Sequence, residues 1–449
     1  MERIGNNGLM KNPQVLAWTV VLISFVLFCI LCVASTFAAY WFFFESPMQL
    51  TTRLVVSRGA ITVNRPDGTS YVVNNNNPNN YVLSNSGLQI DANSQAYLTF
   101  EDSYTGQIVG TLFLLGNSSL TFNEAFRPRF EWSRGRYAML LADAMGRFAV
   151  DIPSGINRGL VLNIRSGPGT AYFEEPGSYS VDASDQQIQL YTRYGKAFLY
   201  NAPSQAWQVN SNAVGVLEKG KQDASLRPYP YDMLNLPYPG PVQPSFGTED
   251  NPDNKTLPLF WACDRDPQSS NEIPGTAVRS QIDNQVVLRI TRRGTDPQGR
   301  PLGPAAAGCS FYFPLSGLRI DQYASFSIQI KMKLMFQDVT TCGIAGSECP
   351  VMLMLEYKDK NGQKHFWRQG FYSLRPPSDT YIQLCDTCPH DHQQINKDTW
   401  YIFDTGDLKQ QFPPDLMDTI TYVRVYASGH QFEVAIAELT VLGGKQTGQ

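Results

Sequence analysis

Charged residues are scarce in this sequence. They make up 17% of its 449 residues, and the formal net charge is −4. A chain with so few cations presents no basic face to a phosphate backbone, so we expect no nucleic acid among its partners. The length exceeds what one hydrophobic core usually supports, which indicates two or three domains.

The short motifs that mark common enzymes are also missing. The sequence has no G-x-S-x-G or H-E-x-x-H pattern, no P-loop and no dinucleotide fingerprint. The Gly-rich stretch 166–170 opens a strand pattern and not a helix, so it lacks the helix N-terminus that holds phosphate. The adjacent acids Glu101 and Asp102, and Glu174 and Glu175, are typical of a solvated surface, because glycoside hydrolysis needs two carboxylates across a cleft. We therefore expect that the chain is not an enzyme.

Helical periodicity is weak outside the first fifty or so residues. The chain has 35 Gly, 29 Pro, 22 Tyr and 25 Phe, arranged in short alternating apolar stretches. This pattern predicts an all-β fold with many turns, preceded by one N-terminal helix.

The one long hydrophobic run covers residues 15–44 and contains no charge. About twenty apolar residues suffice to cross a bilayer as a helix, and a cleaved signal peptide has a much shorter apolar region. We expect an uncleaved transmembrane helix, with the aromatic residues 40–44 at the outer interface.

Charges on the two sides of this run predict its orientation. Arg3 and Lys11 precede it, whereas Glu45 follows it and the next basic residue is Arg53. Basic residues favour the cytoplasmic side. We therefore expect a single-pass protein of the cell membrane, with residues 1–14 as a short cytoplasmic tail and the rest of the chain outside.

Residues 52–220 alternate apolar β-formers with Gly and Asn turns. Ile188, Leu190, Thr192 and Tyr194 share one face by period two, and Gly195 permits a hairpin turn into the next strand. Short stretches follow one another in a characteristic order: "VSRGAITV", "LSNSGLQIDANSQAYLTFED", "SGPGTAYF", "GSYSV", "IQLYTRYGKAFLY" and "GVLEKG".

This order resembles the FecR domain, an extracytoplasmic all-β module of bacterial envelopes, and the resemblance implies the fold. FecR-type regulators of a sigma factor also need a folded cytoplasmic segment. A tail of about fourteen residues is too short to bury a core, so we do not expect the signalling role to carry over.

Residues 221–255 are rich in proline, which favours extended conformations and predicts a semi-rigid linker. Residues 256–444 follow, with a five-residue tail at 445–449. In the stretch 326–334 every second residue is apolar, which predicts a strand whose intervening lysines face water. Asn361 and Gly362 predict a hairpin, and a second one is expected around Ser428 to His430.

The stretches "TWYIFDTGDL", "DTITYVRVYASG" and "FEVAIAELTVL" are ordered as in galactose-binding-like jelly rolls, the sandwich shared by many carbohydrate-binding modules. Such sandwiches bind sugars, peptides or lipids, or act as spacers, so the resemblance implies a fold and not a function.

Six cysteines lie in the expected exterior, where disulfides persist: Cys263, Cys309, Cys342, Cys349, Cys385 and Cys388. The predicted hairpin at Asn361 brings the loops that carry the last four to one end of a sheet. Three outcomes stay open for these four thiols: disulfides that tie the two loops, tetrahedral zinc, or free thiols. Zinc ligands would be the four cysteines, or Cys385 and Cys388 with His390 or His392.

Cys263 and Cys309 would then form the remaining disulfide. We interpret His390 and His392 as solvated residues of an exposed loop. No cofactor is expected, with zinc or a structural calcium ion as the open alternatives.

Aromatic rings pack on sugar faces, so they are the candidate ligand contacts of the last domain. The candidates are Trp367, Tyr372, Tyr381 and Tyr401. Trp367 and the neighbouring Trp400 lie on strand patterns, which also favours a place in the core.

We therefore expect a membrane-anchored, extracytoplasmic, non-enzymatic binding or assembly protein of the bacterial cell envelope. Its C-terminal sandwich would bind cell-wall glycan or an envelope protein. The alternatives are a purely structural component of an envelope assembly and a FecR-type transmembrane sensor.

Overall fold

The fold is described from a computed structural model of the chain. The described residues are 13–78, 81–201, 205–232, 261–266, 273–296, 298–313, 317–338, 340–343, 349–375, 392–413 and 415–444. The expected cytoplasmic tail up to residue 12, most of the Pro-rich segment and the C-terminal tail lie outside these residues.

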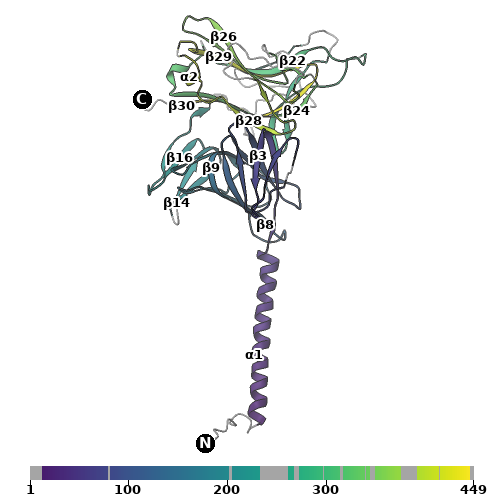
Figure 1. Cartoon of the computed structure of the whole chain (residues 1–449), viewed down its shortest axis with the longest axis vertical. Coiled ribbons are helices and arrows are strands. Elements are labelled where there is room, and N and C mark those ends of the chain that lie inside the picture. The colour runs from purple at the N-terminus through teal and green to yellow at the C-terminus, as the bar shows by residue number, and fades with distance from the viewer. Residues whose placement is uncertain are drawn as a thin grey trace.

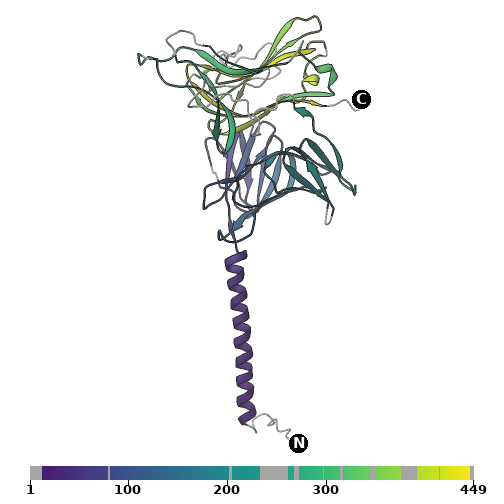
Figure 2. The ribbon, with the colours of Figure 1, turned by 180° about the vertical axis from the view of Figure 1, so that it is seen from behind.

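The first described element is one long apolar helix. Helix α1 (Pro13–Tyr40) continues into a π-helical turn, η1 (Trp41–Glu45). A helix of this length measures about 42 Å, more than the hydrocarbon core of a bilayer. Its side chains are exposed, and the helix stands clear of the β-sheets (Figures 1 and 2). The helix is thus long and apolar enough to cross a membrane.

After this helix, nearly all the described elements are β-strands, which confirms the all-β prediction. The first β domain comprises β1–β17, whose strands form two stacked layers. One layer contains, in order, β4 (Ser70–Asn74), β3 (Ala60–Asn64), β5 (Ser86–Ile90), β8 (Ser119–Pro128), β9 (Tyr137–Ile152), β10 (Leu160–Arg165), β11 (Thr170–Phe173), β14 (Lys196–Asn201) and β15 (Gln205–Asn210), with β1 (Pro47–Gln49) beside β8.

The second layer lies against the first and shares β9 with it. It contains, in order, β2 (Thr51–Arg58), β6 (Gln95–Glu101), β7 (Ile108–Leu114), β9, β12 (Gly177–Ala183), β13 (Gln187–Tyr194), β16 (Ala213–Glu218) and β17 (Ser225–Pro228). The first half of β9 pairs with β8 and β10, and its second half pairs with β7 and β12. Strand β9 therefore forms the corner between the layers.

The hairpin predicted at Gly195 is wrong. Strands β13 and β14 follow each other through Gly195, but β13 pairs with β12 and β16 while β14 pairs with β11 and β15. Strands β2 and β3 part in the same way at Gly59. Both glycines have positive φ, +96° and +68°, which lets the chain turn sharply from one layer into the other.

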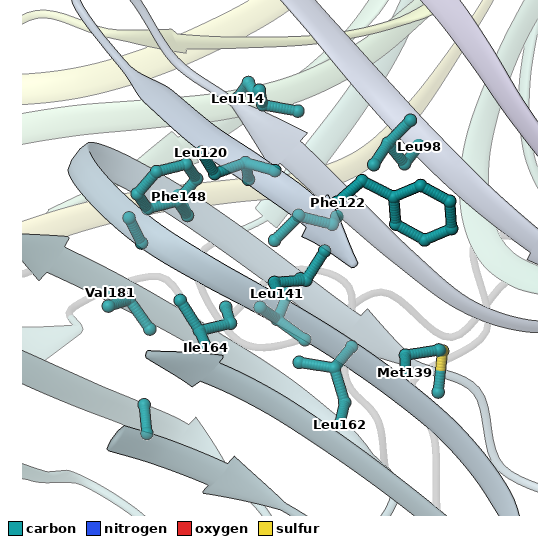
Figure 3. Close-up of a cluster of buried hydrophobic side chains, with 14 of the residues drawn as sticks. Leu98, Leu114, Leu120, Phe122, Met139, Leu141, Phe148, Leu162, Ile164 and Val181 are labelled. Carbon is teal, nitrogen blue, oxygen red and sulfur yellow. The ribbon is translucent and has the colours of Figure 1, made fainter. Parts of the chain in front are cut away.

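Apolar side chains from the two layers meet in one core (Figure 3). Leu98 and Leu114 come from the second layer, and Phe122 and Ile164 come from the first; all four are buried. The period-two alternation predicted for this strand is confirmed for Ile188, Leu190 and Thr192, which are buried. It is wrong for Tyr194, which is 37% exposed, because the pairing of β13 with β12 shifts register between Ser178 and Tyr179.

The C-terminal strands form the outer sandwich, at the end of the molecule remote from the helix (Figure 1). One sheet has the order β20 (Thr276–Ile282), β21 (Gln285–Arg292), β30 (Phe432–Gly444), β24 (Ser325–Gln337) and β28 (Trp400–Asp404), with β18 (Tyr231–Asp232) beside β30. The other has the order β19 (Trp261–Asp266), β22 (Ala305–Tyr312), β29 (Thr419–Gly429), β25 (Val351–Lys358), β26 (Lys364–Tyr372) and β27 (Gln393–Gln394), with β23 (Leu318–Arg319) beside β29. Two short helices complete it, η2 (Ile320–Gln322) and α2 (Leu408–Gln411).

One of the two predicted hairpins in this sandwich is confirmed. Strands β25 and β26 pair through the turn at Asn361 and Gly362. The other is wrong: β29 pairs with β22 and β25, whereas β30 pairs with β21 and β24. The connection near Ser428 therefore crosses between the two sheets. Both strands are largely buried, and each has paired neighbours on both sides in its own sheet.

The outer sandwich docks directly on the first β domain. The faces of β6 and β7 that point away from the core of the first β domain meet the sheet of β24 and β28. A small apolar cluster joins them: Tyr97, Phe113, Val287, Trp400, Ala435 and Ala437. The Ser57 hydroxyl donates a hydrogen bond to the Trp400 carbonyl (2.6 Å), and the Asn396 N–H donates to the Ser57 carbonyl (2.8 Å). The two domains are joined by a packed interface.

This docking corrects the expectation for β24. Its alternating apolar residues from Phe326 to Leu334 are buried, as predicted. Lys331, predicted to face water, is only 3% exposed, because its face of the sheet lies against the first β domain. Its ammonium group pairs there with Asp151 of β9.

The beginning of the segment predicted as a linker belongs to both domains. Strand β17 pairs with β16 of the first β domain, and β18 pairs with β30 of the outer sandwich. Only Tyr229 and Pro230 separate these two strands. The chain thus passes from one domain to the other over a very short distance.

Candidate functional site

The structure places three of the predicted ring contacts inside the protein. Trp367 is fully buried in the core of the outer sandwich. Tyr372 packs in a second buried cluster, and Tyr401 lies in the core of the outer sandwich with its hydroxyl donating to Gln393 Oε1 (2.6 Å). Buried rings offer no face to a sugar, so these three are not an exposed platform. Tyr381 lies outside the described residues.

Among the described residues, the cysteines of the outer sandwich form two disulfides. Cys263 bonds to Cys309 across the paired strands β19 and β22, and Cys342 bonds to Cys349. The second bond closes one loop and does not tie two loops together. Disulfides of this kind are typical of an extracytoplasmic domain.

The described cysteines and His392 do not form a zinc site. The Cys342 and Cys349 sulfurs are bonded to each other, and His392 Nδ1 accepts a hydrogen bond from the Gly370 N–H (3.0 Å). His392 is also buried, which corrects its interpretation as a solvated residue. Within the described ranges no group of three or more His, Cys, Asp or Glu side chains is placed to hold a metal ion. Cys385, Cys388 and His390 lie outside those ranges.

A cleft at the edge of the domain interface is the best candidate for a binding site. Its volume is about 350 Å³, within the range of small-ligand sites. Both domains line it. The first β domain contributes Asp151 of β9 with Arg193 and Tyr194 of β13, and the outer sandwich contributes Glu438 of β30 and the turn between β20 and β21.

The local sequence explains how that turn reaches the cleft. Asp283 and Asn284 are the two residues between β20 and β21, and both have positive φ, +49° and +62°. A two-residue hairpin of this type requires that conformation, which Asp and Asn tolerate best. Asp283 is held in place by the Trp400 indole N–H (2.8 Å) and the Lys333 ammonium (2.9 Å). The turn is therefore fixed, and its Asn284 amide stays exposed.

Opposite charges are paired across the cleft. Glu438 forms an ion pair with Arg193 (2.8 Å), and Asp151 pairs with Lys331. Each pair joins one domain to the other. These contacts hold the cleft walls at a set separation and leave polar atoms along its rim.

Tyr194 is the aromatic residue of the cleft, with 37% of its surface exposed. Burial of its hydroxyl, together with the nearby carboxylates of Glu438 and Asp151, raises the pKa of this phenol well above its usual value. The hydroxyl thus stays protonated and can donate a hydrogen bond. A partly exposed ring beside amide, carboxylate and guanidinium groups can bind a ligand rich in hydroxyl groups.

The sequence patterns do not identify this site. Its lining residues come from segments far apart in the chain, and no motif links them. The only local signal was the Asp-Asn pair at 283–284, which marks a tight turn but not what the turn faces.

Comparisons with known proteins find only distant similarities. No family model matches the chain, and no curated protein matches it. A solved structure from Parabacteroides distasonis, described as an anti-sigma factor, is similar at 13% identity and a TM-score of 0.24. That match covers 32% of this chain and 59% of the other chain.

Carbohydrate-binding modules are also among the similar structures. One is the family 11 module from Clostridium thermocellum, at 9% identity and a TM-score of 0.22, which covers 42% of this chain and 92% of the module. Another is the xylan-binding CBM22-1 domain from Paenibacillus barcinonensis, at 12% identity and a TM-score of 0.21, covering 45% and 93%. These likenesses are too distant to assign a family, so the FecR-like resemblance stays a prediction.

Proposed function

We propose that the chain is a membrane-anchored, extracytoplasmic binding protein of the bacterial cell envelope that holds a glycan in its interdomain cleft. The observation that carries the proposal is the position of Tyr194 at the wall of a cleft lined by polar side chains of two docked domains. A sugar ring would pack on the tyrosine, and its hydroxyls would bond to the Asn284 amide and to free lone pairs of the carboxylates.

Anchoring is supported by two features at opposite ends of the chain. Helix α1 exceeds the length needed to cross a bilayer, and the outer sandwich carries two disulfides, which persist outside the cytoplasm. The N-terminus would lie in the cytoplasm, as the flanking charges suggest.

A binding role without catalysis fits the cleft better than glycoside hydrolysis does. The three carboxylates that line it, Asp151, Asp283 and Glu438, are each paired with a cation. A general acid for that reaction needs a carboxyl group that stays protonated, which apolar surroundings favour and a paired cation opposes.

The test is retention of the full-length chain, held in lipid nanodiscs, on purified cell-wall fractions and on a panel of immobilised glycans. Saturable retention that falls at least tenfold in Tyr194→Ala, roughly the loss of one good contact, would support the proposal. Tyr104→Ala is the matched control, since Tyr104 is exposed in the turn after β6.

Two other outcomes would change the location of the binding site or the kind of ligand. Retention lost in Tyr312→Ala and kept in Tyr194→Ala would place the ligand on the outer face of the sandwich, where Tyr312 contacts Tyr422 (ring centroids 5.3 Å). Retention that needs a wall-bound protein and no glycan would point to a protein partner instead.

A structural role in an envelope assembly is the second candidate. It is favoured by the packed domain interface, which makes the exterior a single body suited to a fixed position in a larger array. The absence of retention on every wall fraction, together with ordered copies of the chain on the cell surface, would favour it. The sensor alternative rests on residues outside the described part of the chain.

A further inference from the structure

The segment between β8 and β9, residues 129–136, lies where the apolar helix meets the first β domain. Its Phe130 ring contacts Phe42 and Phe43 of η1, with ring centroids 5.6 Å apart in both cases. Trp132 stacks on Phe130 at 4.7 Å and is 61% exposed. An aromatic cluster thus continues from the helix onto a surface loop, which we call the juxtamembrane loop.

A buried polar network holds the juxtamembrane loop rigid. Arg127 is fully buried and pairs with Asp102 and with Glu131 of the loop. The Tyr137 hydroxyl donates to Asp102 Oδ2 (2.5 Å). Arg158 donates to the backbone carbonyl of Glu131 (2.6 Å) and also pairs with its carboxylate (2.8 Å). The loop conformation is therefore set by the domain, with Trp132 held outward.

The same network leaves the loop with unbalanced positive charge. Glu131 is its only acid, and two arginines neutralise it. The loop adds Arg129, Arg134 and Arg136, all exposed to solvent. The Arg129 guanidinium lies over the Phe42 ring (5.2 Å), and Arg136 reaches Glu174 (3.3 Å) with more than half of its side chain exposed.

A pocket of about 710 Å³ opens between the loop and the end of the helix. Its lining includes Tyr40 and Phe44 on the helix side and Trp132, Arg134 and Arg136 on the loop side, with Glu45 at one edge. Aromatic rings favour the headgroup level of a bilayer, and basic side chains favour anionic headgroups there. The pocket lies at the level where a membrane crossed by α1 would end.

We propose that the juxtamembrane loop and the end of α1 form a binding site for the headgroup of an anionic phospholipid in the outer leaflet. Trp132 and Phe130 enter the interface, while Arg134 and Arg136 bind the phosphate. The site sets the tilt and height of the exterior above the membrane. This inference rests on the proposed anchoring of α1.

The experiment uses the full-length chain in nanodiscs of phosphatidylcholine mixed with phosphatidylglycerol. After extraction into neutral detergent, the phosphatidylglycerol that copurifies with the protein is measured by mass spectrometry. Each basic side chain near an anionic surface contributes roughly fivefold in binding at low salt. We expect retention to fall by an order of magnitude or more, about twentyfold, in Arg134→Gln/Arg136→Gln, and to fall less in Trp132→Ala.

Arg300→Gln/Arg319→Gln is the matched control, because these two arginines are exposed on the outer sandwich. Equal retention in the loop variant and the control would overturn the lipid site. Displacement of the lipid by millimolar-range inorganic phosphate would also overturn it, since the pocket would then be a general anion site.

Anchoring is tested separately in the same preparations. A chain that alkaline carbonate removes from vesicles would overturn the anchoring and the lipid site together. A chain that stays in the vesicles but shows no lipid preference would overturn the lipid site alone.

Discussion

Gln95 of the first β domain and Ile402 of the outer sandwich are joined by two reciprocal hydrogen bonds. The Gln95 side-chain amide donates to the Ile402 carbonyl (2.9 Å), and the Ile402 N–H donates to Gln95 Oε1 (2.8 Å). The side chain thereby satisfies both backbone groups of Ile402 on the free side of β28, an edge strand that would otherwise be open to pairing. One glutamine thus protects a sheet edge and fixes the position of the second domain.

Replacing this side chain should weaken the domain interface. Gln95→Ala leaves the Ile402 N–H and carbonyl without partners in a buried setting, which we expect to lower the free energy of unfolding by about 1–3 kcal/mol. Thermal or urea unfolding of the full-length chain in mild detergent measures the change. Gln89→Ala, on an exposed part of β5, should change stability by less than about 0.5 kcal/mol. Equal effects of the two substitutions would contradict the role given to Gln95.

The ion pair between Lys331 and Asp151 should contribute far more than an exposed pair. Lys331→Met leaves the Asp151 carboxylate partly buried without its cation, beside Phe113, over which the Lys331 ammonium lies (4.9 Å). We expect the free energy of unfolding to fall by about 3 kcal/mol. Lys360→Met breaks the exposed pair with Asp415 and should lower stability much less than Lys331→Met does. Denaturant unfolding of both variants measures the two losses of stability. A loss in Lys331→Met no larger than that in Lys360→Met would contradict the prediction.

The outer sandwich should self-associate when it is separated from the first β domain. A fragment covering residues 256–444 exposes the face of Trp400, Val287, Ala435 and Ala437 that the interface buries. An apolar patch of this kind promotes association. We expect self-association in light scattering, in contrast to a monomeric fragment covering residues 46–444. A monomeric, equally heat-stable sandwich fragment would show that the interface is not needed.

Strand patterns in the sequence predicted local structure well where one face of a strand is buried. The alternation from Phe326 to Leu334 identified the core face of β24, because apolar side chains at period two must share one side of a sheet. It could not show that the opposite face, with Lys331, is also covered. That depends on a second domain whose contacts are more than a hundred residues away.

Turn signals were less informative about partners. Gly195 marks a sharp turn in either case, but only the long-range pairing decides whether the next strand returns in the same layer or enters the other. The candidate site has the same limitation. Asp151, Arg193 and Glu438 meet because two domains dock, and no local pattern encodes that meeting.

The two disulfides should differ in their contribution to stability. The Cys263–Cys309 bond closes a loop with a sequence separation of 46, and Cys342–Cys349 one of 7. Loop-closure entropy predicts losses of about 4 and about 2.5 kcal/mol when each pair is replaced by alanines. Denaturant unfolding under oxidising conditions measures both.

The reverse order would show that packing outweighs chain entropy at the second bond. A methyl group at Gly370 would overlap the Cys342 sulfur, so this disulfide is tightly packed on β26. Gly370→Ala should therefore destabilise the oxidised chain more than the variant that lacks Cys342 and Cys349.

Asp102 should make the first β domain sensitive to acid. Burial alone would raise the pKa of this carboxyl, but hydrogen bonds from the Tyr137 hydroxyl and the Tyr104 N–H, together with Arg127, hold the pKa below its ordinary value of 3.8. Since the folded pKa is lower than the unfolded one, the carboxylate stabilises the fold above about pH 4. This contribution is lost as the pH falls through the lowered folded value.

Asp102→Asn should consequently be less stable than the wild type at pH 7, with the difference narrowing as the pH falls below about 4. Unfolding curves collected across the acidic range measure it. Asp415→Asn removes a carboxylate that stays in water and should stay within about 0.5 kcal/mol of the wild type. The same network orients the juxtamembrane loop, so Asp102→Asn should also reduce retention of phosphatidylglycerol at neutral pH. A variant that unfolds more easily but keeps its full lipid retention would separate the two roles and show that the loop holds its shape without Asp102.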